Sequence, residues 1–317
     1  NIFNINKGNS LTLINLILEN GKANNGGAIN NNGVLYIINC TFQANIATNN
    51  GGAIYNSKTG KLTINGTIFQ NNEVKNGGGA IYSLSPISID SSKFINNKAT
   101  ATNGNGAQGG AIYIYQASEM STITNSIFTN NTAYSFGGAI RAYQSPLTID
   151  NCIFTGNNLN TYYNSKNGGS RGGAINSAEA ELDIFNSQFI NNEAGDAGGA
   201  IRTNGTVNIN NCKFIGNKLT NTKVSTYGSA IYCNYGKYVN ITNCDFTNQN
   251  GKYGVVYAIG STELNIKDST FTNNTASEGV IYTNNTHNNI DNVIIKNNTG
   301  DAISITNGSS NINNVNI

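Results

Sequence analysis

The tetrapeptide Gly-Gly-Ala-Ile at residues 26–29 decides the fold, because it returns six more times along the chain. The later copies begin at Gly51, Gly78, Gly109, Gly137, Gly172 and Gly198. Looser copies follow at residues 228–231, 254–256, 279–281 and 301–303. Self-similarity at a fixed period is the signature of repeat architectures, so the chain is expected to form a solenoid or a related array.

A second motif accompanies each copy. A large apolar residue, usually Phe, follows the Gly-Gly-Ala-Ile segment, and Asn usually stands three places after it, as in Phe42 and Asn45. The members of the aromatic series are Phe42, Phe69, Phe94, Phe128, Phe154, Phe189, Phe214, Phe246 and Phe271. Extended from Ile5 to Ile303, the register gives twelve units with a mean period of about 27 residues.

Each unit is expected to hold three short strands. The first carries the Ile of the tetrapeptide, the second reads Leu-x-Ile, as in Leu147 and Ile149, and the third reads Cys/Ser-x-Phe, as in Cys152 and Phe154. Alternation places these side chains on one face. Asn or Asp between the second and third strands, such as Asn151, suits a tight corner because Asn tolerates the left-handed backbone.

The composition supports a turn-rich, all-β fold. The 317 residues include 63 Asn and 36 Gly, and both disfavour helices, which excludes a helical bundle, a coiled coil and a doubly wound α/β domain. Hydrophobic residues at 38% argue against disorder. A net charge of +2 gives no nucleic-acid footprint, and no apolar run reaches the length of a membrane span. A propeller blade needs a longer repeat, and a leucine-rich repeat needs helices, so a parallel β-helix fits best.

The paired Gly-Gly-Ala-Ile and Phe-x-x-Asn tetrapeptides resemble the repeats of the chlamydial polymorphic outer-membrane proteins. The Asn- and Thr-rich form is also similar to adhesin-like surface proteins of methanogenic archaea. Both resemblances imply a single-stranded right-handed parallel β-helix, here about twelve three-stranded coils. They also imply display outside the cell and a role in adhesion. We therefore expect residues 1–317 to be one β-helix repeat domain and a fragment of a longer surface protein.

The residue after the core Ile points away from the solenoid axis. Down the coils this column, here called the ladder, is expected to form a continuous outward row of Tyr and Arg. Its members are Asn30, Tyr55, Tyr82, Tyr113, Arg141, Asn176, Arg202, Tyr232, Tyr257, Tyr282 and Ser304. Tyrosine offers an apolar ring and a hydroxyl, which suits sugars and protein partners. The alternative is that Tyr is simply a good strand residue.

Arginine is the sharper signal, because all three arginines of the chain fall in the sixth to eighth coils. A planar guanidinium suits carboxylate or phosphate, and the longest loops lie nearby, so an acidic glycan or anionic wall polymer is the expected ligand. The alternative is local salt bridging with Glu179, Glu181, Asp183, Glu193 and Asp196. The predicted ligand-binding residues are Arg141, Arg171, Arg202, Tyr113, Tyr162, Tyr163, Tyr232 and Tyr257.

The sequence therefore favours an extracellular, cell-surface adhesin-like protein whose partner is a surface glycan, a wall polymer or a surface protein of another cell. One alternative is a filament or sheath subunit that stacks head to tail. The other is a polysaccharide lyase or hydrolase, which needs clustered carboxylates. The ladder contains none, Asp90 and Asp150 stand two coils apart, and His287 has no obvious partner. No catalytic residue, metal or cofactor is expected.

The five cysteines carry little chemistry in this interpretation. Cys40, Cys152, Cys212 and Cys244 occupy the small inward position two residues before Phe, and Cys233 also points inward. Buried free Cys behaves as a small hydrophobe. A disulfide between Cys212 and Cys244, on adjacent coils, is the open alternative.

Overall fold

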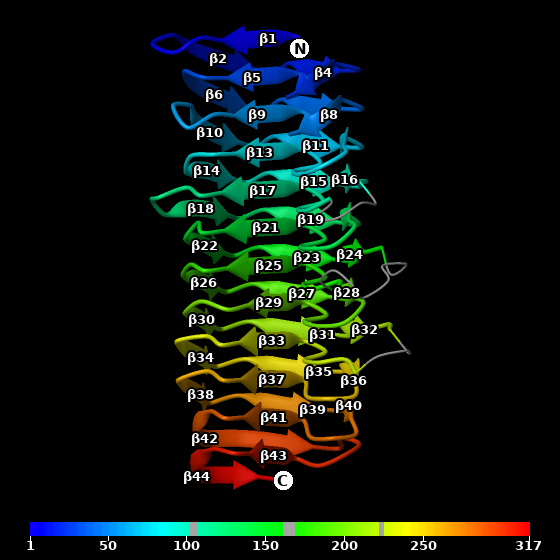
Figure 1. Cartoon of the computed structure of the whole chain (residues 1–317), viewed down its shortest axis with the longest axis vertical. Coiled ribbons are helices and arrows are strands. Elements are labelled where there is room, and N and C mark those ends of the chain that lie inside the picture. Colours follow the sequence, from blue (N-terminus) through cyan, green and yellow to red (C-terminus); the bar gives the residue numbers. More distant parts are fainter. Residues whose placement is uncertain (102–106, 161–168, 222–224) are drawn as a thin grey trace.

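In the computed structural model, which describes residues 1–101, 107–160, 169–221 and 225–317, the chain forms a parallel β-solenoid (Figure 1). Each coil stacks on the previous one, and every pairing between named strands is parallel. The described residues contain no helix, and therefore none that is long and apolar enough to cross a membrane. The predicted all-β fold of about twelve coils is confirmed.

Sheet A faces the viewer in Figure 1 and has twelve strands, one from each coil. Its strands are β1 (Phe3–Ile5), β5 (Ile29–Asn31), β9 (Ile54–Asn56), β13 (Ile81–Ser83), β17 (Ile112–Tyr115), β21 (Ile140–Tyr143), β25 (Ile175–Ala178), β29 (Ile201–Thr203), β33 (Ile231–Asn234), β37 (Val256–Ile259), β41 (Ile281–Asn284) and β43 (Ile303–Thr306).

Sheet B has 22 strands and carries the expected second and third strands of each unit. The second strands are β2 (Ser10–Ile14), β6 (Val34–Ile38), β10 (Lys61–Asn65), β14 (Ile87–Asp90), β18 (Ser121–Thr124), β22 (Leu147–Asp150), β26 (Leu182–Phe185), β30 (Val207–Asn210), β34 (Tyr238–Thr242) and β38 (Glu263–Lys267). The third strands are β3 (Ile17–Glu19), β7 (Thr41–Gln43), β11 (Ile68–Gln70), β15 (Lys93–Ile95), β19 (Ile127–Thr129), β23 (Ile153–Thr155), β27 (Gln188–Ile190), β31 (Lys213–Ile215), β35 (Asp245–Thr247) and β39 (Thr270–Thr272). In the last two coils both strands merge into β42 (His287–Lys296) and β44 (Ser309–Asn316).

Sheet C is a third face that the strand pattern did not predict. It has ten short strands in the segment that follows Phe and Asn. They are β4 (Lys22–Asn25), β8 (Ile46–Asn50), β12 (Glu73–Val74), β16 (Lys98–Ala99), β20 (Thr132–Ala133), β24 (Asn158–Leu159), β28 (Glu193–Ala194), β32 (Lys218–Leu219), β36 (Asn250–Gly251) and β40 (Thr275–Ala276). Each coil therefore has three faces, but the expected second and third strands share one of them.

The core is a column of stacked aromatic rings. All nine Phe residues of the repeat, from Phe42 to Phe271, are fully buried, and successive ring centroids lie 4.5 to 4.9 Å apart. Parallel stacking at the spacing of adjacent strands keeps each ring in contact with the next. The same spacing places the aliphatic residues of sheets A and B in matching columns, such as Ile149 above Ile184.

The corners explain much of the Asn content. Asn151 has a φ of 52° at the turn between β22 and β23, and Asn39 has the same value in an earlier coil. A second left-handed column lies two residues after Phe, as at Asn130 with a φ of 55°. Asn is one of the few residues that adopt this conformation easily. The expectation that Asn turns the chain between strands is confirmed.

The Asn three places after Phe has a different role, because its side chain is buried inside the solenoid. Asn131 donates from Nδ2 to the Phe94 carbonyl oxygen at 2.9 Å and to Asn157 Oδ1 at 3.0 Å. Its backbone N–H also donates to Asn157 Oδ1, at 3.0 Å. The same pattern repeats from coil to coil, so the buried amides form a hydrogen-bonded row along the axis from Asn45 to Asn217.

All five cysteines are buried and free, as the inward column predicts. Cys212 and Cys244 are both thiols, so the alternative of a disulfide between them is not adopted. Burial raises the pKa of the Cys152 thiol to about 12. This thiol is therefore protonated at neutral pH and suits packing rather than nucleophilic chemistry.

Candidate functional site

The ladder lies on the outer face of sheet A, in register from coil to coil. Arg141 in β21 pairs with Tyr113 on one side and Asn176 on the other, and Arg202 in β29 pairs with Asn176 and Tyr232. Strand pairing therefore places Arg141 and Arg202 two coils from each other, which is about 10 Å along the axis. The spacing expected from the sequence is confirmed.

A second column runs beside the ladder, formed by the residue directly before each glycine pair. These residues make parallel bridges from coil to coil in the order Gln108, Phe136, Arg171, Ala197, Tyr227 and Tyr253. Arg171 therefore belongs to an ordered column instead of a connecting loop. The sequence signal for this column is its fixed place before the glycine pair, which marks it as part of the repeat.

Arg141 is held in place by the two columns and is only 7% exposed. Its guanidinium carbon lies 5.2 Å from the ring centroids of both Phe136 and Tyr143. Nε donates to Gln108 Oε1 at 3.2 Å, and Nη1 donates to Asn176 Oδ1. Such stacking and hydrogen bonding fix a guanidinium and leave few of its donors for a ligand.

Within the described residues, the side chains of Arg202 and Arg171 make fewer hydrogen bonds than that of Arg141. Arg202 Nε is buried and has no hydrogen-bond partner in the described part of the chain. Burial, together with the neighbouring charges of Arg171 and Arg141, lowers the pKa of Arg202 to about 10. Three like charges therefore lie close together, and a donor without a partner costs free energy unless an anion approaches it.

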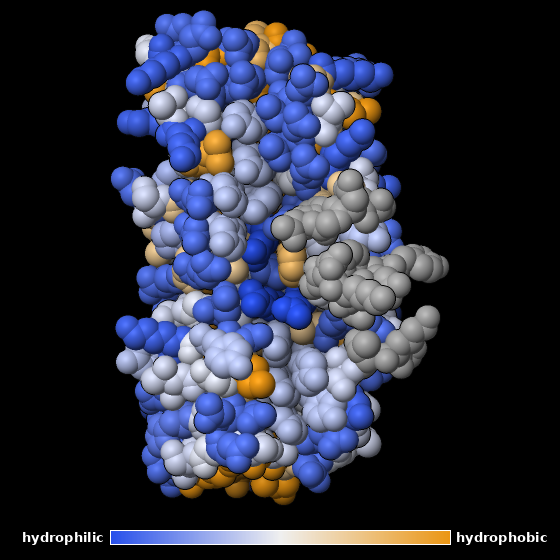
Figure 2. Space-filling model, in the orientation of Figure 1, coloured by the Kyte–Doolittle hydropathy of each residue, from blue (hydrophilic) through white to orange (hydrophobic). Residues whose placement is uncertain are grey.

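Local salt bridging does not neutralise this cluster within the described ranges, where the one ion pair joins Lys218 and Glu193 at 3.2 Å. Asp196 accepts instead from the backbone N–H of Ser170, at 3.0 Å. Glu179 accepts from Gln144 Nε2 at 2.8 Å. Figure 2 shows a strongly hydrophilic patch at mid-height on this face.

Tyrosines lie on both sides of the arginine cluster. On one side, Tyr113 is half-buried and meets Tyr82 and Tyr115 edge-on, with ring centroids 5.2 and 5.8 Å away. On the other side, five rings pack together into what we call the tyrosine platform: Tyr227, Tyr232, Tyr253, Tyr257 and Tyr282.

Packing within the platform decides which of its tyrosine rings are accessible. Tyr232 and Tyr257 point outward, but they are only 8% and 5% exposed because neighbouring rings cover them. Tyr227, for example, lies 4.9 Å from Tyr257 between ring centroids. The rings that remain accessible are those of Tyr227, Tyr253 and Tyr282. None of the three is among the predicted ligand-binding residues, although Tyr282 belongs to the ladder. Tyr162 and Tyr163 lie outside the described residues.

The residues considered for catalysis have structural partners. Asp90 and Asp150 share a column with Thr124 between them, as expected. Hydrogen bonds, first from Thr124 and then from Asn125 and Ser91, lower the pKa of Asp90, which is the opposite of what a general acid needs. His287 Nδ1 lies 2.6 Å from Ser309 Oγ, so this side chain does have a partner. The described residues hold no group of three or more potential metal ligands.

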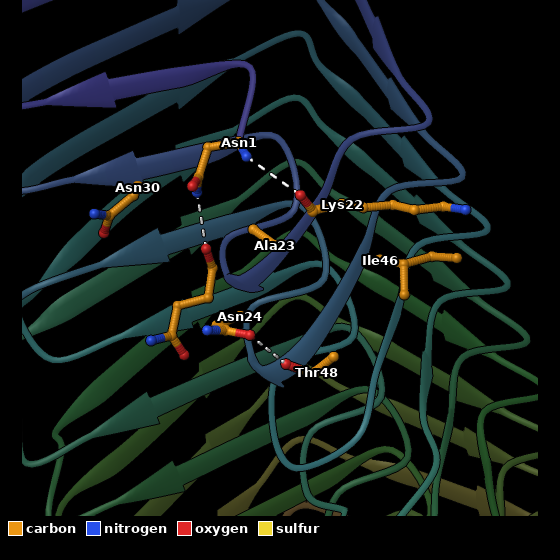
Figure 3. A pocket seen from close by; sticks show the side chains of 8 residues that line it. Asn1, Lys22, Ala23, Asn24, Asn30, Ile46 and Thr48 are labelled. Carbon is orange, nitrogen blue, oxygen red and sulfur yellow. Dashed lines mark hydrogen bonds between the residues drawn. The ribbon is translucent and has the colours of Figure 1, made fainter.

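A hollow of about 710 Å³ lies at the first two coils, far from the arginines (Figure 3). Its amides bond to a hydroxyl and to the backbone: Thr48 Oγ1 donates to Asn24 Oδ1 at 3.1 Å, and Asn1 Nδ2 donates to the Asn25 carbonyl at 2.8 Å. The lining includes one charged side chain, Lys22. With its polar groups already paired, this hollow offers less for ligand recognition than the arginine cluster.

The uncompensated charge of Arg202 leads to a first prediction. We expect Arg202→Met to raise the free energy of unfolding by about 1–2 kcal/mol at pH 7, with allowance for partial exposure, because it removes a half-buried cation and keeps the packing of the stem. The pKa of Arg202 is lower in the folded state than in the unfolded state, so its charge destabilises the fold at every pH below about 10. This destabilisation decreases as the pH rises above that value, because the folded protein then loses the proton first. Urea unfolding of both proteins measures the difference.

The matched control is Lys61→Met, which removes an exposed charge from sheet B. We expect this change to alter stability by less than about 0.5 kcal/mol. A loss of stability in Arg202→Met would mean that the guanidinium makes net stabilising contacts and that the cluster is structural.

Comparison with known proteins finds two similarities, one to a repeat family and one to a single longer protein. Residues 39–57, 66–84 and 125–143 match the Chlamydia polymorphic membrane protein repeat, and each match runs from the corner before a Phe through the next sheet A strand. A segment of the chain is 36% identical over 115 residues to the protein named "Probable autotransporter YfaL" of Escherichia coli (strain K12). That segment is 31% of this chain and 8% of the relative, so the chain matches a small part of a much longer protein.

Proposed function

We propose that this chain is part of a surface-displayed, adhesin-like protein and that the outer face of sheet A binds an anionic glycan. The surface location is supported by the polymorphic membrane protein repeats and by the similarity to a probable autotransporter. A rigid solenoid suits such display because every coil presents the same face to the outside.

The observation that carries the binding proposal is the unpaired Arg202. Its Nε lacks a partner, Arg171 lies beside it, and no carboxylate among the described residues pairs with either side chain. A carboxylate or sulfate placed between the two guanidinium groups would accept charge-assisted hydrogen bonds and relieve the like-charge repulsion. Arg171 and Arg202 are the main binding residues in this proposal, because Arg141 already donates hydrogen bonds to Gln108 and Asn176.

Binding to a heparin-coated sensor, compared with a neutral dextran surface, tests the proposal. We expect the protein to bind heparin in a salt-sensitive way, and not dextran. The double substitution Arg171→Gln and Arg202→Gln should weaken binding at least about 100-fold, because two charge-assisted contacts are lost.

The double substitution Lys61→Gln and Lys93→Gln is the matched control, since it removes an equal charge from exposed positions on another sheet. Equal binding by the double variant and the wild type would overturn the proposal. Formation of unsaturated sugar products during the assay would instead favour a polysaccharide lyase.

A further inference from the structure

The positive charges on this face continue beyond the arginine cluster. Lys252 lies in the tenth coil, and its Nζ is 5.0 Å from the ring centroid of Tyr253. The bridges from Ala197 to Tyr227 and from Tyr227 to Tyr253 place this lysine two coils beyond the coil of Arg202. The two charges are therefore about 10 Å apart along the axis, with a coil of tyrosines between them.

On this face, the intervening coil presents uncharged aromatic rings. Tyr227 is half-buried, and its ring lies 6.0 Å from Tyr232 and 5.4 Å from Tyr253 between centroids. Below these rings, Tyr257 stacks on Tyr282 at 4.9 Å with an interplanar angle of 7°. Mutual packing holds the accessible rings rigidly, which lowers the entropy lost when a ligand settles on them.

Charge, aromatic ring and charge thus alternate along the solenoid axis. A linear polysaccharide in which acidic and neutral sugars alternate matches this order. The repeat of such a chain is a disaccharide, whose length is comparable to two coils. The apolar face of a neutral sugar suits a tyrosine ring, and its acidic neighbours suit the flanking cations.

We infer that the ligand is a linear polysaccharide of alternating acidic and neutral sugars that lies along the long axis of the solenoid. One acidic group binds between Arg171 and Arg202, the next neutral sugar packs on Tyr227 and Tyr253, and the following acidic group reaches Lys252. This inference rests on the proposed anion-binding function and specifies its ligand class and direction.

Titration calorimetry with hyaluronan and unsulfated chondroitin, compared with poly-L-glutamate, tests the inference. Poly-L-glutamate supplies charge without sugar rings. We expect at least one of the two polysaccharides to bind about tenfold more tightly than poly-L-glutamate, because only a sugar can use the platform. Lys252→Gln and Tyr253→Ala should each weaken polysaccharide binding by about tenfold.

Two further variants keep the result interpretable. Tyr253→Phe preserves the ring and should retain most of the affinity, which excludes a collapse of the platform as the cause. Tyr55→Ala removes a ladder ring from the other end of the face, where Tyr55 stacks on Tyr82 at 5.7 Å, and should leave binding unchanged.

The outcomes separate the inference from the function on which it rests. If heparin and poly-L-glutamate bind through the arginines but neither polysaccharide binds better, the ligand class is wrong and the anion site stands. If Tyr253→Ala and Lys252→Gln leave polysaccharide binding unchanged, the direction along the platform is wrong. If none of these polyanions binds, the anion site itself is overturned and the inference falls with it.

Discussion

Gly138→Ala destabilises the solenoid by at least about 3 kcal/mol, because the new methyl group has no room between two coils. A Cβ at this position would overlap the Gly173 carbonyl oxygen of the next coil and lie 2.7 Å from the Asn158 carbonyl oxygen. Both obstacles are backbone atoms, so no side chain can turn away. Gly138 does not have a positive φ, so the expected loss of stability comes from steric overlap and not from backbone strain. Urea unfolding followed by far-UV circular dichroism measures it.

The ninth coil shows when a side chain can replace the second glycine of the pair. Ser229 takes the place of the second glycine in the ninth coil and is fully buried. The next coil is one residue shorter here, since Ser229 N–H donates to the Gly254 carbonyl and Ala230 N–H to the Val255 carbonyl. The carbonyl that would clash is therefore missing, and a side chain fits.

Gly236→Ala is the matched control for Gly138→Ala. A Cβ there would lie 3.0 Å from its nearest neighbour, the Gly205 carbonyl oxygen, so a small adjustment is enough. We expect a change within about 1 kcal/mol. Equal unfolding midpoints for the two variants would contradict the steric account of the glycine pair.

The repeat made the core predictable from sequence. The positions of Phe154, the small residue Cys152 and the corner Asn151 follow from alternation within one unit, and all three take their expected places. Sheet C was missed because strands such as β12 have two residues, too few for alternation to appear. A usable signal existed in the apolar residue five places after Phe, such as Val74 and Leu159, which is buried in successive coils.

The candidate site was only partly predictable for a related reason. Sequence periodicity shows which residues point outward, but exposure depends on what packs beside them. Tyr232 points outward and is buried because Tyr227, from the preceding segment of the same coil, covers it. Whether Arg141 or Arg202 keeps free donors depends likewise on side-chain contacts with Gln108 and Asn176, which no spacing rule specifies.

Asn157→Ala should lower the free energy of unfolding by about 3–5 kcal/mol, since it interrupts the buried row of amides. Asn157 Nδ2 donates to the Phe128 carbonyl at 2.9 Å and to Asn192 Oδ1 at 3.0 Å. Its Oδ1 accepts from the backbone N–H and the Nδ2 of Asn131, both at 3.0 Å. Alanine leaves the Phe128 carbonyl and both Asn131 donors buried without these partners. Urea unfolding gives the total loss, and hydrogen exchange should show it first in the adjacent coils.

One natural interruption of this row supplies the reciprocal test. Gln249 stands where the repeat has Asn; its Oε1 is buried without a partner in the described part of the chain, and its Nε2 turns back to the Thr247 carbonyl at 2.9 Å. Gln249→Asn should reconnect Asn217 to Asn274 and raise stability by about 1–2 kcal/mol.

Asn208→Ala, which removes an amide from the half-exposed outer row of sheet B, should cost less than about 1 kcal/mol. If Asn157→Ala costs no more than Asn208→Ala, or if Gln249→Asn is destabilising, the buried amides do not hold the coils together. In that case the stacked phenylalanines and the backbone hydrogen bonds between strands would stabilise the solenoid without the buried amides.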